Sequence, residues 1–230
     1  MVKKQTKEST GSEAIKTLLS SRVQILHYLK QAVGAGNFDY RTFGTAIEEH
    51  LSNVIIGVFK KNGFIKSEKD YAVSPHKNYF PDFELKTSPP IAIEFKSGNR
   101  KQNRQGKWIA VKNSENDMGT LGEWPKRIIK FGGKNIYYIF VIYEFDEKTK
   151  QVKNIEIAPF YEFLGLNKAR VLKYREKDGN LRPKNFDAKP PIKTFEQFEQ
   201  LLNKTVVYRS KRIIKKHRQI IKDAKNVKKG

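Results

Sequence analysis

The spacing of apolar and polar residues predicts helices at the start of the chain and strands in its middle. Apolar positions recur at helical spacing over 13–33 and over 41–62, and a glycine-containing turn follows each segment. The short apolar segments 71–73, 80–85 and 91–96 have the length and composition of strands. We therefore expect two helices to precede a group of three closely connected strands.

The second half of the chain continues this alternation. Residues 135–145 form a long apolar run typical of a buried strand. Residues 152–158 are expected to form a strand that pairs with it across a polar turn. A helix is expected over 119–130, before that run, and a further strand over 169–174, after it. The order helix, helix, strands, helix, strand predicts an α/β fold in which helices flank a mixed β-sheet.

The C-terminal part divides into a long loop and two helical segments. Residues 175–193 contain prolines, a glycine and many charges, and loops of this length are commonly functional or unstructured. A helix is expected over 195–202 and a strongly basic helix over 208–226. The resulting organisation is a flexible N-terminus over 1–11, one domain over 12–205 with its core at about 40–160, and a basic C-terminal helix over 206–230.

The chain is strongly basic. Its 46 lysines and arginines outnumber 24 acidic residues, which gives a formal net charge of +22 and predicts attraction to a polyanion. Cysteine is absent, which excludes disulfides and cysteine-based zinc sites and suits a reducing cytoplasm. No apolar run reaches the length of a membrane span. Binding along a membrane surface would need a basic helix with a broad apolar face, whereas the C-terminal segment has only a narrow stripe of Ile213, Ile214, Ile220 and Ile221.

One apolar strand carries two charges at its C-terminal end. Side chains alternate along a strand, so Glu94 and Lys96 share one face while Ile93 and Phe95 share the other. Buried charges persist mainly when they are paired or bind a metal. If Asp82 ends a neighbouring strand, two carboxylates and one ammonium meet, and hard divalent cations prefer such oxygen ligands. The alternative is an exposed hairpin whose Glu–Lys pair contributes little.

These residues form a motif that resembles the PD-(D/E)xK nuclease superfamily: Pro81-Asp82, a gap of eleven residues, then Glu94-Phe95-Lys96. The resemblance implies a restriction-endonuclease-like core and hydrolysis of DNA. It implies that Asp82, Glu94 and the carbonyl of Phe95 bind Mg²⁺. Lys96 would orient or deprotonate the attacking water, or stabilise charge on the phosphate.

The helix over 41–62 carries a further candidate. Many members of the superfamily have an additional glutamate in a Gly-x-x-x-Glu setting, which the segment from Gly44 to Glu48 matches. The resemblance therefore implies that Glu48 belongs to the catalytic group. The alternatives are Glu49, and an ordinary helix acid stabilised by the helix dipole.

Three polar segments are candidates for contact with DNA. The segment after Lys96 is cationic and is expected to be a loop that clamps phosphates through Asn99, Arg100, Lys101, Gln102, Asn103, Arg104 and Lys107. The loop 175–193 is expected to enter the major groove with Asn180, Arg182, Lys184 and Asn185. The segment before the motif is expected to approach the minor groove with Lys77 and Asn78.

The order of these features is similar to that of blunt-cutting type II restriction endonucleases of the EcoRV kind. That similarity implies a homodimer which cuts both strands of a specific double-stranded site, with the helix over 13–33 as a candidate interface. Here the second acid is Glu94 rather than aspartate and the gap after Asp82 is shorter, which puts the branch and the cleavage pattern in question. The alternatives are a structure-specific nuclease such as a junction resolvase, and a non-catalytic basic protein that binds nucleic acid.

Overall fold

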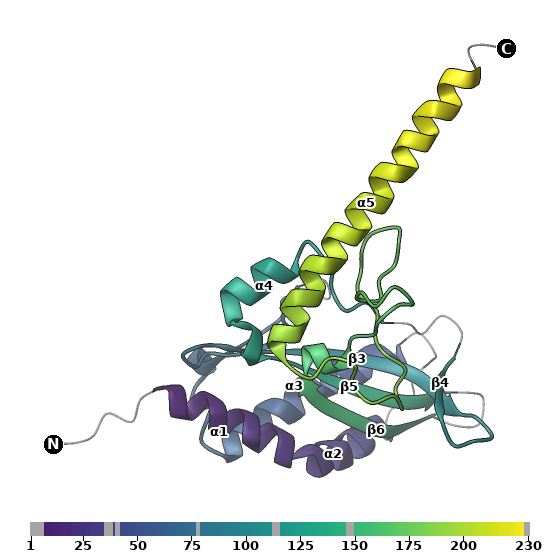
Figure 1. The fold of residues 1–230 in the computed structure, drawn as a ribbon. Helices are drawn as coiled ribbons and strands as arrows, with labels where there is room; N and C mark the ends of the chain where they lie inside the picture. The colour runs from purple at the N-terminus through teal and green to yellow at the C-terminus, as the bar shows by residue number, and fades with distance from the viewer. Residues whose placement is uncertain are drawn as a thin grey trace.

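The structure, a computed structural model, describes residues 7–34, 39, 42–76, 79–111, 116–145 and 150–227. It is built around one mixed β-sheet with helices on both faces, which confirms the predicted fold class (Figure 1). The strands are β1 Tyr71–Val73, β2 Phe83–Leu85, β3 Ile91–Gln102, β4 Trp108–Ala110, β5 Ile136–Phe145 and β6 Lys150–Pro159. They lie in the order β1-β2-β3-β5-β6, and β4 pairs with the end of β3.

The parallel pair β3–β5 forms the centre of the sheet, and the pairs β1–β2, β2–β3 and β5–β6 are antiparallel. Two parallel strands need a long crossover connection, and here it contains helix α4 (Trp124–Phe131). Because elements cover both of its faces, β5 is buried from Ile136 to Tyr143. This burial accounts for its almost continuous apolar sequence.

Three helices cover one face of the sheet: α1 (Lys7–Ser20), α2 (Arg22–Gly34) and α3 (Phe43–Lys61). Their apolar sides share a core with Ile93 and Phe95 of β3. The packing of α3 on this face places its first turns beside the middle of β3, where the charged residues of the motif lie.

The opposite face is covered by α4 and by the first turns of α5 (Phe195–Val227). The rings of Trp124 and Phe160 stack there with their centroids 4.1 Å apart, and Phe198 packs edge-on against both. Helix α5 contacts the preceding loop as far as Arg212, which pairs with Glu176, and then projects away from the sheet (Figure 1). No helix among the described residues is long and apolar enough to cross a membrane. Short 3-10 helices complete the fold at Glu68–Asp70, Gly133–Asn135 and Phe160–Phe163.

The N-terminal boundaries differ from those predicted. The helix expected over 13–33 is divided at Ser21 into α1 and α2. The Thr17 carbonyl accepts both the Ser20 hydroxyl at 3.0 Å and the Ser21 N–H at 2.9 Å, so helical hydrogen bonding continues across the division. Helix α1 begins at Lys7, inside the segment 1–11 that was expected to be flexible, and residues 1–6 lie outside the described residues.

The C-terminal boundaries also differ. The two helices expected over 195–202 and 208–226 are one helix, so the boundary placed at 206 falls inside α5. Thr205 is fully buried at the junction; its hydroxyl donates to the Leu201 carbonyl at 2.5 Å and accepts the Leu172 N–H at 3.0 Å. The strand expected over 169–174 contributes only isolated bridges.

Candidate active site

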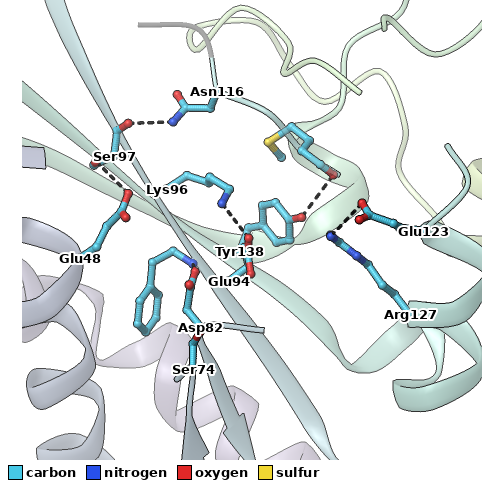
Figure 2. Close-up of polar contacts among 12 residues, drawn as sticks. Glu48, Ser74, Asp82, Glu94, Lys96, Ser97, Asn116, Glu123, Arg127 and Tyr138 are labelled. Carbon is cyan, nitrogen blue, oxygen red and sulfur yellow. Dashed lines mark hydrogen bonds and ion pairs between the residues drawn. The ribbon is translucent and has the colours of Figure 1, made fainter. Parts of the chain in front are cut away.

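Asp82, Glu94 and Lys96 lie together where β2 meets β3 (Figure 2). Phe83 pairs with Ile93 in the antiparallel ladder, so the next step of the register places Asp82 opposite Glu94. Lys96 follows on the same face, with its Nζ 2.7 Å from Glu94 Oε1. Glu94 is only 7% exposed, which excludes the alternative of a hairpin pair on the solvent face.

The Asp82 carboxylate is held by the main chain of the neighbouring strand. Its Oδ2 accepts a hydrogen bond from the Phe95 N–H at 2.6 Å, so a side chain continues the pairing of β3 beyond the start of β2. The carbonyl of a strand residue points to the same edge as its N–H. The Phe95 carbonyl is therefore directed toward the edge at which Asp82 and Glu94 meet.

The charges at this edge perturb one another. Burial raises the pKa of Asp82, the negative charge of Glu94 raises it further, and the value reaches about 7. Burial lowers the pKa of Lys96, but the attraction of Glu94 and smaller contributions from Tyr138 and Asp82 outweigh it, so that pKa is raised. Lys96 is therefore an ammonium at neutral pH, whereas Asp82 is close to the midpoint of its protonation.

The donor set fits a hard divalent cation. Glu94 Oε2 is buried and has no hydrogen-bond partner among the described residues, and it lies beside a carboxyl whose pKa is raised. A bound cation would give Glu94 Oε2 a partner and would lower the pKa of Asp82. Within the described ranges no three His, Cys, Asp or Glu side chains group around a common point, so the protein would supply two carboxylates and a carbonyl. Mg²⁺ commonly binds through one or two carboxylates and keeps several waters.

Glu48 reaches the same region from α3. Its Oε1 accepts a hydrogen bond from the Ser97 hydroxyl at 3.0 Å. Burial raises its pKa, and Lys96 acts in the opposite direction. The helix approaches β3 closely at Gly44, where a Cβ would lie 3.1 Å from the Ser97 hydroxyl. Glu49 is exposed, so Glu48 is the glutamate that the fold brings to the site, and its part in catalysis stays a prediction.

Sequence reasoning missed Tyr138 and Arg127, which border the site (Figure 2). Tyr138 pairs with Glu94 in the register of β5 with β3, and burial and the Glu94 charge raise its pKa. The guanidinium of Arg127 lies 3.9 Å from the ring centroid of Phe80 and 3.3 Å from Glu123 Oε2. Tyr138 belongs to an apolar run and Arg127 to a basic helix, so neither stands out from its neighbours in sequence.

The start of the cationic segment after Lys96 is strand rather than loop. Asn99 and Arg100, both expected to contact DNA, are 1% and 5% exposed on β3. Asn99 donates to the Phe145 carbonyl at 3.1 Å and accepts the Phe145 N–H at 3.3 Å. Arg100 donates to the Asn99 carbonyl at 2.9 Å and lies over the ring of Phe186. Asn99 is enclosed within the fold, which corrects the expectation that it clamps phosphates. Contact with DNA stays a prediction for Arg100, which also lines a cavity beside Lys107 and Asn185.

The remaining members of that segment lie around the β3–β4 hairpin. Asn103 caps its turn by accepting the N–H groups of Gln105 and Lys107, both at 2.9 Å. Contact with DNA stays a prediction for Asn103 and for the exposed residues Lys101, Gln102, Arg104 and Lys107.

The late loop is more tightly packed than expected. Arg182 is 9% exposed and pairs with Asp117 at 2.8 Å, and Lys184 donates to the Phe186 carbonyl at 3.0 Å. Asn180 takes part in a bridge with Thr120. Arg182 and Lys184 are therefore not presented freely to a groove, whereas Asn185 is exposed. Lys77 and Asn78 lie outside the described residues.

The hairpin and the late loop, predicted separately, are adjacent in the structure. Asp187 accepts the Trp108 N–H at 2.5 Å, and the two segments enclose a cavity of about 380 Å³. Lys107, Trp108, Lys173 and Asn185 are among the residues that line it. A hollow lined by cations and an aromatic ring suits a polyanion backbone or a stacked base.

The mixed sheet, its helical layers and its strand order define a restriction-endonuclease-like fold. Among solved structures, the chain is similar to the NlaIV restriction endonuclease, with a TM-score of 0.57 and 18% sequence identity over 81% of this chain and 79% of that chain. At this identity the likeness shows the fold. No family model matches the chain, and no curated protein matches it.

Proposed function

We propose that the protein is a Mg²⁺-dependent endonuclease that hydrolyses phosphodiester bonds in double-stranded DNA. The observation that carries the proposal is the placement of Asp82 opposite Glu94, with Lys96 2.7 Å from Glu94, on adjacent strands of a restriction-endonuclease-like fold. The net charge of +22 supports a polyanionic substrate.

Each residue of the site has a distinct part in this proposal. Hydrolysis joins the oxygen of a water to phosphorus and breaks the bond to the 3′ oxygen, which takes up a proton. Mg²⁺, held by Asp82, Glu94 and the Phe95 carbonyl, would polarise the phosphate and lower the pKa of water. Lys96 carries a positive charge at neutral pH, so it stabilises the charge that develops on the phosphate better than it serves as a base. Glu48 is positioned through Ser97 next to this group.

The decisive test is cleavage of supercoiled plasmid in MgCl₂ and in EDTA. We expect cutting only with Mg²⁺, and loss of cutting in Asp82→Ala and Lys96→Ala. Glu84→Gln is a matched control, because Glu84 lies on β2 two residues after Asp82 but pairs with Lys130 at 3.0 Å. Cutting that survives Asp82→Ala or Lys96→Ala in a folded protein, or that is equal in EDTA, would overturn the proposal.

We further propose that the enzyme is a homodimeric type II restriction endonuclease, with a blunt-cutting, EcoRV-like pattern. A two-fold dimer places one active site on each strand of a symmetric target. Discrete plasmid fragments support sequence specificity, whereas cutting confined to branched DNA indicates a junction resolvase. DNA binding without cutting in Mg²⁺ indicates the non-catalytic alternative. Sequencing the fragment ends gives both the site and the stagger.

A further inference from the structure

The distal part of α5, residues 206–224, exposes apolar side chains in a regular pattern. Each of the six is between 38% and 55% exposed, and they form three adjacent pairs: Val206 and Val207, Ile213 and Ile214, and Ile220 and Ile221. A helix that projects from the body of a protein does not need such residues for its own core (Figure 1). A row of them marks a surface that another molecule covers.

The pairs recur every seven residues. A straight helix has 3.6 residues per turn, so a strict seven-residue repeat keeps facing one direction only if the helix winds around a partner. Ser210, His217 and Ala224 lie four residues after the first member of each pair and complete the alternating spacing of four and three that defines a coiled-coil seam. We call this row, 206–224, the α5 seam.

Most cations of this segment lie away from the seam. Of seven lysines and arginines over 206–224, only Arg209 and Lys216 are at positions that flank the seam on the side opposite Val207, Ile214 and Ile221. The other five occupy the outer positions of the repeat: Lys211, Arg212, Lys215, Arg218 and Lys222. The apolar row and the charge therefore occupy different sides of one helix.

We propose that the α5 seam binds the α5 seam of a second copy of this chain, as an antiparallel pair of helices. A partner must present the same seven-residue repeat for the two rows to stay in contact, and a second copy satisfies this condition throughout. A flat lipid surface or a DNA groove imposes no such repeat. This inference assigns a contact surface to the dimer that the proposed function requires, but it does not depend on cleavage.

The residues beside the seam favour the antiparallel orientation. In that orientation each flank of the seam meets the same flank of the partner, so Val207 meets the partner's Ile221 and Ile214 meets the partner's Ile214. The other flank brings Asp223, the one acid of 206–224, toward the partner's Arg209, and it brings Lys216 next to the partner's Lys216. The guanidinium of Arg209 also donates to the Glu176 carbonyl of its own chain at 3.2 Å. A parallel pair would instead place Ile214 and Ile221 against the flank that carries Arg209, Lys216 and Asp223.

The positive charge of the two helices opposes this association, and this repulsion determines how the dimer responds to salt. Residues at the outer positions point away from the seam, and at physiological salt the screening length is about 8 Å. Raising the salt concentration therefore strengthens the proposed dimer. Binding of the same helix to DNA would weaken instead, because it depends on released counterions.

The test is the mass of the full chain in solution, by sedimentation equilibrium, without DNA or metal. We expect a concentration-dependent mass that approaches twice that of one chain and rises with salt. Ile214→Ser with Ile221→Ser should give a monomer, whereas the matched control Lys215→Ser with Lys222→Ser, one residue further along the helix, should remain dimeric. A monomeric wild type, or a dimer that survives the isoleucine changes, would overturn the inference. Because these measurements need no cleavage, they succeed or fail separately from the proposed nuclease activity.

Orientation is read by cross-linking, since the chain has no cysteine of its own. Val207→Cys and Ile221→Cys should form a disulfide only when the two variants are mixed, and Ile214→Cys should cross-link to itself. Self-linking of Val207→Cys would contradict the antiparallel arrangement. Monomers that sediment with anionic vesicles through the same isoleucines would show that the surface binds lipid and would overturn the proposal.

Discussion

The raised pKa of Asp82 predicts a pH-dependent loss of stability that Asp82→Asn removes. The ordinary value is 3.8, and burial together with the charge of Glu94 raises the pKa to about 7 in the folded protein. Between these values the folded protein keeps a proton that the unfolded chain has released. The free energy of unfolding therefore falls as the pH rises from 3.8 to about 7, and this group contributes no further change above that window.

The magnitude follows from the size of the shift. Ionising Asp82 in the folded protein costs at most about 4 kcal/mol at pH 8. The side chain is only half-buried and water screens part of the repulsion, so we expect about 2 kcal/mol. For a chain of this size that corresponds to roughly 4–8 °C in Tm. The amide oxygen introduced by Asp82→Asn can still accept the Phe95 N–H, so the hydrogen bond at this edge is retained.

Thermal unfolding followed by circular dichroism, in EDTA, measures this effect. We expect Asp82→Asn to have a higher Tm than the wild type at pH 8, and the difference to shrink at pH 5. Glu84 lies two residues after Asp82 and is paired with Lys130 rather than facing Glu94, so the difference in Tm between Glu84→Gln and the wild type should not grow between pH 5 and pH 8. Equal pH dependence of the wild type and Asp82→Asn would refute the reasoning that Asp82 and Glu94 repel each other in the folded protein.

Two further predictions concern residues on either side of the motif. Glu48→Gln should lower the rate of plasmid cleavage by about 10- to 100-fold, since Glu48 contacts Ser97 beside the carboxylates, whereas Glu49→Gln on the exposed side should leave it unchanged. An equal effect of both changes on the cleavage rate would contradict a specific role of Glu48 in the site. Asn99→Ala should destabilise the protein by about 1–3 kcal/mol in urea unfolding, because it removes two hydrogen bonds to the main chain of Phe145. Its affinity for DNA in fluorescence anisotropy should stay the same, and a selective loss of affinity would contradict a structural role.

Local pattern was sufficient to predict the charged strand. Alternation along 91–96 separates Glu94 and Lys96 from Ile93 and Phe95, and the structure keeps that separation. The pattern over 41–62 likewise places Glu48 on a helix. What the pattern lacks is the register between strands, which turns Asp82 toward Glu94 and fixes it on the Phe95 N–H.

The errors arise where distant segments decide the environment of a polar residue. Asn99 and Arg100 read as loop because they are polar, yet Phe145 and Phe186, far away in sequence, provide a hydrogen-bonding edge and an aromatic surface for them. Two helices were expected over 195–202 and 208–226, where the structure has the single helix α5. The Leu172 N–H bonds to the Thr205 hydroxyl and holds the helix together at that point. Neither partner is visible in a local window of sequence.

The energetics of the site favour the proposed metal centre over a purely structural ion pair. A fold stabilised by Lys96 and Glu94 alone would gain nothing from a second buried carboxylate opposite Glu94, because the pKa of Asp82 near 7 is a cost to the folded protein. The main chain of Phe95 nevertheless fixes Asp82 in that place. Oxygen atoms held together against their mutual repulsion, one of them without a hydrogen-bond partner among the described residues, bind a divalent cation more strongly than relaxed ones would. In the proposed nuclease, the loss of stability at Asp82 would be the counterpart of metal affinity, which a purely DNA-binding protein would not require.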